Sequence, residues 1–519
     1  MERTKNATKN MLFGWILHCY NMILPFIVRT VMIYTLGIQY LGLNSLFVSI
    51  ITVLNLAELG VGNAMVFSMY KPIAENDEDK ICKLMNLYKL YYRIIGIVIC
   101  VLGIIVSPFL KYIIKSDVPQ DINIYILYFL NLSLTVSSYW LFSYKSSLLY
   151  AFQKRYIESK IIMVVNTIKT VLQLLSLYFT KNYYIYIIIA IVFQIISNIT
   201  IAIFTNRYFP QYKARGMLEK TEIKDINRKV KDLFTAQIST TFIGQVDTII
   251  ISAFLGLRYL AIYQNYFYIL SSVRTLITVA FHSCIAGIGN SIIVESEEKN
   301  IGDLKKLTFI VCWISGVCMS CFLGLYQPFM KIWVGEELML GYGAVISFSL
   351  YFYVLEINQL LSVYKEAGGL WSKDKYRPLA TAVLNIILNL LLVKHLGIYG
   401  IIFATFISML VVSIPWLFQN LFTELFSKKW LKYYLKKLFG YTIISLISAT
   451  ITTIICININ LGDFQTLFVR MIICVLVPNI IYIIVYFKKT EMEELINLID
   501  VMTNRRFNLI NILKRFRKE

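Results

Sequence analysis

Six ionisable side chains lie inside long apolar stretches of the sequence, and their types suggest binding chemistry. Three are cations and three are carboxylates: Arg29, Lys169, Arg274, Asp247, Glu58 and Glu356. An ionised side chain at the centre of a bilayer costs about 2.5–3.5 kcal/mol or more, so each raises a functional hypothesis. The cations would suit concentrated negative charge such as a diphosphate, which accepts paired hydrogen bonds from Arg. The carboxylates would suit a coupling Na⁺ or H⁺.

Structural ion pairing is the alternative use of these charges. Arg29 and Asp247 occupy nearly equivalent positions in two halves of the chain, so a pair between them would neutralise both. Both also lie near the ends of their apolar stretches, where a side chain can reach the membrane surface. Lys169 and Arg274 lie at least about two helical turns from such ends, which favours ligand binding. Arg470 lies close to an end and is interpreted as an interface anchor.

Neutral polar side chains share the same apolar stretches. Amides and tyrosines are what a sugar-binding surface needs, because they offer donors, acceptors and flat apolar faces. The sugar-contacting candidates are Gln237, Gln245, Gln264, Asn265, Asn358 and Gln359. Hydrogen bonding between helices is an equally good interpretation of any single one of them. Most of the 36 tyrosines are assigned to the membrane interface.

The composition shows which elements must position these residues. Of 519 residues, 58% are hydrophobic and only 15% are charged, and the mean hydropathy is +0.66. Soluble domains are about 45–50% apolar and about 25% charged. A soluble fold could not cover this much apolar surface, so the sequence predicts a multi-pass membrane protein.

Apolar stretches of about 20 residues, the length that spans a bilayer as a helix, recur along the chain. Six are predicted near 11–36, 44–70, 90–112, 123–143, 160–180 and 185–205. Six more are predicted near 233–255, 260–290, 307–333, 342–366, 379–396 and 399–423, and a last pair near 438–458 and 467–487. The sequence therefore predicts an all-α protein with 14 transmembrane helices and both termini in the cytoplasm. Gly and polar residues predict bends in 44–70 and 260–290.

These spans group into five predicted regions. They are an N-terminal six-helix bundle (1–205), a basic cytoplasmic linker (206–232), a C-terminal six-helix bundle (233–423), an extra helix pair (424–487) and a basic cytoplasmic tail (488–519). Most of the 50 Lys and Arg residues lie in alternate loops and the two tails. This asymmetry is typical of loops on the cytoplasmic side. It explains the net charge of +20 better than nucleic-acid binding does.

Matching motifs at one offset indicate an internal duplication. Leu36-Gly37-x-x-Tyr40-Leu41 recurs as Leu255-Gly256-x-x-Tyr259-Leu260, 219 residues later. The pairs Pro108-Phe109, Tyr144-Lys145 and Tyr156 recur 220 residues later as Pro328-Phe329, Tyr364-Lys365 and Tyr376. Since six helices separate the copies, the halves are parallel repeats. Two such bundles around a central cavity predict a transporter that works by alternating access.

The sequence gives little support for an enzyme or a metal-binding protein. The sequence has no Walker A motif, and no loop is long enough to hold a catalytic domain. The nine cysteines lie mostly in apolar stretches, and the pair Cys318 and Cys321 has neither a second pair nor a nearby His. We therefore expect no catalytic residue, no metal site and no enzyme activity.

These features together resemble one branch of a transporter superfamily. The duplicated bundles, the extra helix pair and the buried cations are similar to polysaccharide transporters of the multidrug/oligosaccharidyl-lipid/polysaccharide exporter superfamily, above all the Wzx-type flippases for lipid-linked oligosaccharides. The stretch from Arg29 to Asn44, the run Leu56-Ala-Glu-Leu-Gly60, Tyr144-Lys-Ser-Ser-Leu-Leu149 and Val246-Asp247-Thr-Ile-Ile-Ile-Ser252 look like the corresponding parts of such proteins.

The resemblance implies a flippase in the bacterial plasma membrane. It would move undecaprenyl-diphosphate-linked repeat units to the outer leaflet for capsule, O-antigen or exopolysaccharide assembly. Its diphosphate site would be Arg29, Lys169 and Arg274. Coupling to Na⁺ or H⁺ is common among relatives, with Asp247 and Glu58 as candidates here. Partners would be the bilayer, the glycan lipid, and a polymerase and glycosyltransferases, with no nucleic acid and no cofactor beyond the ion.

Two alternatives stay open at this point. Lipid II flippases of the same superfamily resemble the chain in helix number, whereas drug antiporters usually have twelve helices. A protein of another class, a membrane scaffold for a polysaccharide assembly complex, would use the same buried charges to hold its helices together.

Overall fold

The computed structural model describes residues 2–58, 60–115 and 118–502, and in short stretches such as 235–243 it describes the backbone alone. Every regular element among the described residues is a helix, which confirms the predicted all-α class. The chain forms two compact units, Met1–Gln264 (unit 1) and Asn265–Glu519 (unit 2). The five predicted regions stay a prediction.

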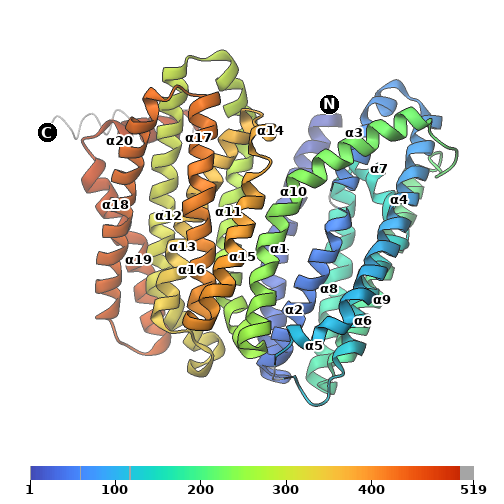
Figure 1. Cartoon of the computed structure of the whole chain (residues 1–519), viewed down its shortest axis with the longest axis horizontal. Helices are drawn as coiled ribbons and strands as arrows, with labels where there is room; N and C mark the ends of the chain where they lie inside the picture. Colours follow the sequence, from blue (N-terminus) through green and yellow to red (C-terminus); the bar gives the residue numbers. More distant parts are fainter. Residues whose placement is uncertain (1, 59, 116–117, 503–519) are drawn as a thin grey trace. The chain divides into compact units, whose positions relative to one another are not determined.

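Unit 1 is built from the first ten α-helices (Figure 1). They are α1 (Glu2–Thr35), α2 (Ile38–Leu54), η1 (Asn55–Glu58), α3 (Val61–Glu75), α4 (Glu78–Val106), η2 (Ser107–Phe109), α5 (Leu110–Ile113), α6 (Ile124–Trp140), η3 (Ser143–Lys145), α7 (Ser146–Ala151), α8 (Arg155–Thr180), α9 (Tyr183–Tyr208) and α10 (Lys220–Leu255). Asn123 and Asn182 start α6 and α9, because each side chain accepts bonds from two backbone N–H groups of the first turn.

Helix α11 (Leu257–Val294) begins in unit 1 and continues into unit 2. Unit 2 then contains α12 (Glu297–Val334), η4 (Glu336–Leu338), α13 (Tyr342–Ala367), α14 (Trp371–Asp374), α15 (Arg377–Leu396), α16 (Ile398–Ser408), the π-helical turn η5 (Met409–Ser413), α17 (Ile414–Glu424), α18 (Lys429–Ile457), α19 (Asp463–Tyr486) and α20 (Thr490–Met502).

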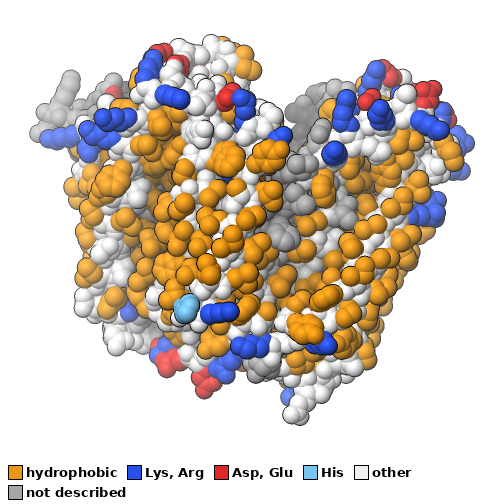
Figure 2. All heavy atoms as spheres, in the orientation of Figure 1, with side chains coloured by type: hydrophobic (Ala, Val, Ile, Leu, Met, Phe, Trp, Pro, Cys, Tyr) orange, Lys and Arg blue, Asp and Glu red, His pale blue; other side chains and the backbone are white. Residues whose placement is uncertain are grey.

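The long helices carry the apolar stretches read from the sequence. Among the described residues, nine helices are long and apolar enough to cross a membrane, or up to eleven if two bent pairs each count as one span. The predicted number of 14 and the cytoplasmic termini stay predictions. On the face in Figure 2, hydrophobic side chains cover the middle of each unit, and most Lys and Arg lie near its ends. This is the pattern of helices that cross an apolar layer.

The duplicated motifs share a backbone conformation. Gly37 and Gly256, the second residues of the two Leu-Gly copies, have φ values of 113° and 92° and ψ values of 166° and 173°. Only glycine adopts such angles without strain, so the same residue ends the first helix of each half in the same way. Gly42 allows a second close approach, because an added Cβ there would lie 2.2 Å from the carbonyl oxygen of Leu257.

The two spans for which bends were predicted are bent. The 44–70 stretch is divided into α2, η1 and α3, and Gly60 begins α3 in the left-handed region with φ 88°. The segments Leu257–Val279 and Cys284–Val294 of α11 meet at 44°. The predicted 123–143 span corresponds to α6 (Ile124–Trp140), and a further bend follows directly after it. There α6 stops at Trp140, and the segment Ser143–Ala151 turns away by 44°.

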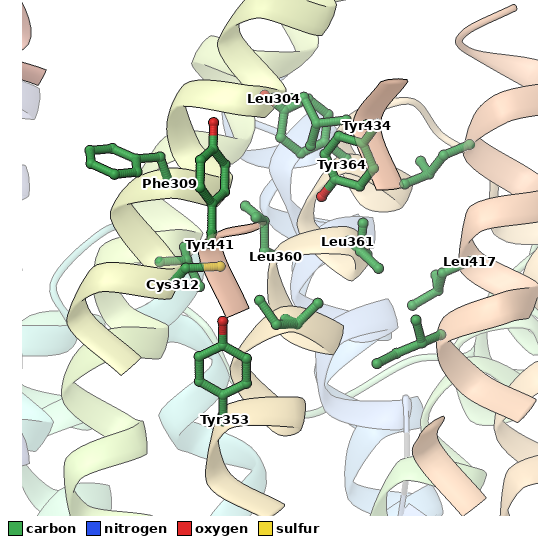
Figure 3. Close-up of a cluster of buried hydrophobic side chains, with 14 of the residues drawn as sticks. Leu304, Phe309, Cys312, Tyr353, Leu360, Leu361, Tyr364, Leu417, Tyr434 and Tyr441 are labelled. Carbon is green, nitrogen blue, oxygen red and sulfur yellow. The ribbon is translucent and has the colours of Figure 1, made fainter. Parts of the chain in front are cut away.

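The core of unit 2 is rich in aromatic side chains. Helices α18 and α19 pack on α12 and on each other. Figure 3 shows part of the resulting cluster, with residues of α12, α13, α17 and α18 pointing toward one another: Leu304, Phe309, Cys312, Tyr353, Leu360, Leu361, Tyr364, Leu417, Tyr434 and Tyr441. The extra helix pair is therefore an integral part of the core of unit 2.

Helix α20 is held against unit 2 by ion pairs. Lys437 Nζ lies 2.7 Å from Glu491 Oε1, and Tyr441 Oη donates to the same oxygen at 3.0 Å. Lys305 Nζ lies 3.1 Å from Glu494 Oε1. Since Glu491 is only 3% exposed, its carboxylate needs these partners.

Candidate functional site

The two predicted cations of unit 1 lie on neighbouring helices. Arg29 is on α1 and Lys169 is on α8, and these two helices pack against each other. Both side chains are half-buried. Among the described residues Lys169 has no hydrogen-bond or ion-pair partner. An ammonium group inside an apolar helix without an anion favours the approach of an anionic ligand.

Arg274 and Glu356 form a charged site within unit 2. Glu356 on α13 is 0% exposed, and neither carboxylate oxygen has a hydrogen-bond partner in the described part of the chain. The charge of Arg274 on α11 acts on this carboxylate, but no salt bridge within 4 Å joins the described side chains, and Arg274 Nε is also unbonded. Buried polar groups are normally satisfied. Arg274 therefore retains hydrogen-bonding capacity for a ligand.

Arg29 and Lys169 belong to unit 1 and Arg274 to unit 2. A single diphosphate site formed by all three therefore stays a prediction. The same holds for ion coupling by Asp247, Glu58 and Glu356.

Several predicted polar residues lie on α10 and α11. Asp247 is 5% exposed, and the neighbouring Thr248 Oγ1 accepts a bond of 2.8 Å from Gln264 Nε2. Gln264 thus joins α10 to α11, as the alternative interpretation of the amides expects. Gln245 is half-buried and Asn265 is fully buried. The side chain of Gln237 lies outside the described residues.

Asn358 and Gln359 lie on α13, where Asn358 belongs to a closed polar network. Ser413 Oγ donates to Asn358 Oδ1 at 2.7 Å and accepts from Arg377 Nη1 at 2.6 Å. Arg377 also donates to both carboxylate oxygens of Asp374, at 2.7 and 2.8 Å. Arg377 and Asp374 are 8% and 4% exposed. Asn358 is therefore a structural partner, and Gln359 is half-buried beside it.

Unit 1 contains a polar pocket. Of its lining residues, Glu58 alone was predicted from the sequence to have a role. Its volume is about 320 Å³, and it lies among η1, α4, the end of α6, η3, α8 and α9. Its lining residues are Glu58, Tyr92, Ser138, Tyr139, Phe142, Ser143, Ser146, Glu158, Ile162, Asn166, Gln194, Ser197, Asn198 and Ile201. We call this cavity the unit 1 pocket.

Tyrosines orient the carboxylate of Glu58 in this pocket. Tyr92 Oη donates to Oε1 at 2.9 Å, and Tyr139 Oη donates to Oε2 at 2.8 Å. Tyr88 Oη in turn donates to Tyr92 Oη at 2.7 Å. Such chains of hydrogen bonds fix the geometry of a partly buried group. Glu58 therefore has hydrogen-bond partners without a cation, unlike the ion pair considered from sequence.

Sequence interpretation missed Glu158 and the pair Asp374 and Arg377. Glu158 and Arg377 lie at the starts of α8 and α15, and Asp374 ends the short helix α14. All three are next to basic residues that were assigned to cytoplasmic loops. The spacing of Asp374 and Arg377, three residues apart, was a signal for an ion pair across one helical turn. Nothing in the spacing of Glu158 indicated that it shares a pocket with Glu58, because 100 residues separate them.

Comparisons with known proteins agree with this architecture. A profile of the family described as polysaccharide biosynthesis protein matches residues 7–286, more than half of the chain. No curated protein matches the sequence. The solved lipid II flippase MurJ, in an inward closed conformation, superposes with a TM-score of 0.64 at 17% identity, over 92% of this chain and 99% of MurJ.

Two MATE transporter structures share the fold more distantly. The MATE transporter VcmN of Vibrio cholerae superposes with a TM-score of 0.53 at 13% identity, over 81% of this chain and 98% of its own. The eukaryotic MATE transporter AtDTX14 gives 0.52 at 13% identity, over 86% and 100%. At these identities the likeness concerns the fold, and it confirms the architecture that the resemblance implied.

Proposed function

The chain belongs to the polysaccharide biosynthesis protein family, and on this premise we propose that it is a flippase for lipid-linked oligosaccharides. Its cargo is an undecaprenyl-diphosphate-linked repeat unit, which it moves from the inner to the outer leaflet of the bacterial plasma membrane. The exported units serve the assembly of capsule, O-antigen or exopolysaccharide. The protein is a transporter and carries out no reaction on its cargo.

One observation supports this proposal most directly: cations lie in apolar helices with unused hydrogen-bonding capacity. Lys169 has no anionic partner among the described residues, and Arg274 Nε is buried without a bond. A diphosphate supplies concentrated negative charge and acceptor oxygens for such donors. We assign its binding to Arg29, Lys169 and Arg274. A scaffold would instead pair a cation such as Lys169 within the protein.

Coupling to an ion is part of the proposal. Glu356 is the favoured coupling group, because its carboxylate is buried without a hydrogen-bond donor, and protonation or Na⁺ binding would remove the cost of burying that charge. Asp247 and Glu58 are the further candidates. A polymerase and glycosyltransferases of the same pathway are the proposed protein partners.

A lipid II flippase is the second candidate function. The superposition with MurJ favours it at the level of fold, and lipid II also carries a diphosphate. The family description, which refers to polysaccharide biosynthesis, favours the oligosaccharide cargo.

The deciding experiment is to identify the lipid that accumulates in cells lacking this protein. An undecaprenyl-diphosphate oligosaccharide on the cytoplasmic side, with surface polysaccharide lost, supports the proposal, and its mass identifies the cargo. Accumulated peptidoglycan precursor with lysis of the cells supports the second candidate. Absence of any accumulated lipid contradicts transport of this class.

A point variant separates binding from assembly. Arg274→Ala should abolish export at unchanged protein level, because the diphosphate loses a buried donor. Arg258→Ala is the matched control, since Arg258 is exposed on the same helix α11, and it should export normally. Normal export by Arg274→Ala would contradict the assigned role.

A further inference from the structure

We infer that the unit 1 pocket binds a single sugar ring that carries no negative charge, either neutral or amino-substituted. The inference rests on the proposed function, because a lipid-linked oligosaccharide supplies the ring. It adds a sugar site within unit 1. Glu58 is the one lining residue for which the sequence had suggested a role. Glu58 was then considered for ion coupling or pairing.

A broken helix borders the pocket. Helix α6 ends at Trp140, and Phe142, Ser143 and Ser146 beyond the break line the cavity. Phe142 has a φ of 59°, in the left-handed region that costs a bulky residue energy. In membrane proteins non-helical backbone is tolerated where it lines a cavity, and broken helices form binding sites in transporters.

Packing inside unit 1 holds this break in place. Trp140 Nε1 donates to the carbonyl oxygen of Arg93 at 3.2 Å. Gly96 leaves room for the indole ring, since an added Cβ there would lie 2.1 Å from Trp140 Nε1. Asn198 Nδ2 donates to the carbonyl oxygen of Ser138 at 3.2 Å near the end of α6. The break is therefore a built feature of the fold, with its own partners.

The polar groups of the lining residues suit a sugar. The lining residues carry two carboxylates, three amides, four serine hydroxyls, two tyrosine hydroxyls and the ring of Phe142. Hydroxyl groups of a sugar need such donors and acceptors, and its apolar face packs on an aromatic ring. The volume of about 320 Å³ lies at the small end of the range for small-molecule pockets, about 300–1,000 Å³. It exceeds what a bare ion requires.

The charged residues that line the pocket are acidic. Glu58 and Glu158 both line the pocket, whereas none of its lining residues is Lys or Arg. Arg155 and Tyr150 lie beside Glu158, and the Arg155 guanidinium carbon is 4.5 Å from the centre of the Tyr150 ring. Glu158 thus has a cation nearby, whereas in the described part of the chain the donors to Glu58 are the hydroxyls of Tyr92 and Tyr139. A ligand with a carboxylate or phosphate would be repelled, and an amino group would be attracted.

The test measures binding of free sugars to the intact protein in detergent. We would record saturation-transfer NMR and calorimetry with glucosamine, glucose and glucuronate. Glucosamine and glucose should bind and glucuronate should not. Glu158→Gln and Asn166→Ala should each weaken glucosamine binding at least tenfold. Glu75→Gln is the matched control, because Glu75 is an exposed carboxylate of unit 1 outside the pocket, and it should bind as the unmodified protein does.

The outcomes distinguish this inference from the proposed function. Absence of sugar binding, equal binding of glucuronate, or unchanged binding by both pocket variants overturns the sugar site. Accumulation of lipid-linked oligosaccharide in cells lacking the protein would then still support the flippase. Binding of glucosamine that depends on Glu158, without accumulation of such a lipid, supports the pocket and contradicts the flippase.

Discussion

The two units differ around the duplicated motif Tyr144-Lys145 and Tyr364-Lys365. In unit 1, α6 breaks after Trp140 and the residues beyond it line an open polar pocket. In unit 2, α13 runs unbroken from Tyr342 to Ala367. At the helix ends that correspond to the rim of the pocket, a network of hydrogen bonds joins Arg377, Asp374, Ser413 and Asn358 to one another.

Single residues account for this difference. At the offset of 220, Arg377 corresponds to the buried Ile157, and Asp374 corresponds to Lys154. The ion pair of Asp374 and Arg377 in unit 2 therefore has no counterpart at these two positions of unit 1. Its carboxylate Glu158 lies where unit 2 has Pro378, a residue without a charge. One copy of the repeat uses charge to stabilise its own helix ends, and the other leaves polar groups facing a cavity.

Removing the buried cation of unit 2 should have the largest effect. Arg377→Met removes the bidentate partner of the buried Asp374 and leaves it Lys365 Nζ at 3.5 Å and Asn420 Nδ2 at 3.3 Å. We therefore expect a loss of about 3 kcal/mol, at the low end for a broken buried pair. Thermal unfolding of the purified protein should show a large loss of stability.

Two controls make this result specific. Arg155→Met beside the unit 1 pocket should change stability by less than about 1 kcal/mol, since Arg155 is exposed. The double variant with Asp374→Leu and Arg377→Met should recover part of the loss, because the buried carboxylate is gone and Lys365, which pairs with it at 3.5 Å, keeps Glu366 at 3.7 Å. Equal losses in Arg377→Met and Arg155→Met would contradict the contrast between the units.

Two glycines at equivalent positions of the repeat allow a test of how the break after Trp140 is held. Gly96 and Gly316 are 220 residues apart. An added Cβ at Gly96 would lie 2.1 Å from Trp140 Nε1, whereas at Gly316 its nearest neighbours are Ser445 atoms at 3.1 Å. Gly96→Ala must displace the indole ring, so we expect a loss of about 1–3 kcal/mol, as for other overpacked sites.

Gly316→Ala needs only a shift of a few tenths of an ångström and should cost less than about 1 kcal/mol. Thermal unfolding measures both variants, and tryptophan fluorescence reports the displacement in Gly96→Ala. If Gly316→Ala is the more damaging of the two, the role given to Trp140 in holding the break is wrong.

The pH dependence of α20 probes the charged contacts of unit 2. Burial raises the pKa of Glu491, but hydrogen bonds from Lys437, its own backbone N–H and Tyr441 outweigh burial and lower it to about 2, from an ordinary value of 4.5. A lowered pKa in the folded protein means that the carboxylate stabilises the docked helix above about pH 4.5. This contribution should disappear as the pH falls from about 4.5 to about 2.

A spin label on exposed Asn497 of α20, introduced through Asn497→Cys after Cys19 and Cys284 are replaced by Ser, would report detachment as increased mobility. Glu491→Gln should release the helix already at neutral pH. Unchanged mobility in that variant would show that the Lys305–Glu494 pair and apolar packing are sufficient to hold α20.

The sequence predicted most of the fold because a bilayer imposes a simple rule on helix length and polarity. The Leu-Gly motifs even identified Gly37 and Gly256, whose shared conformation excludes other residues. The break after Trp140 could not be predicted, since no Gly or Pro precedes it and the reason lies in α4, at Gly96. The charges inside spans were recognisable singly. The tyrosine partners of Glu58 and the Ser413 partner of Arg377 come from helices distant in sequence, so these groupings required the structure.

The smallest expected effect lies in the loops that follow the compared helices. Gln153 is exposed and has a φ of 57°, which glycine adopts without strain. Its counterpart Lys373 lies within the short helix α14 and pairs with Glu424 at 3.0 Å. Gln153→Gly should therefore stabilise unit 1 by about 0.5–1 kcal/mol, and Lys373→Gly should destabilise unit 2 by about 1 kcal/mol. Thermal unfolding should show shifts of opposite sign. Two shifts of the same sign would mean that the units close this loop by the same local conformation, and that their difference is confined to the pocket and the ion pair.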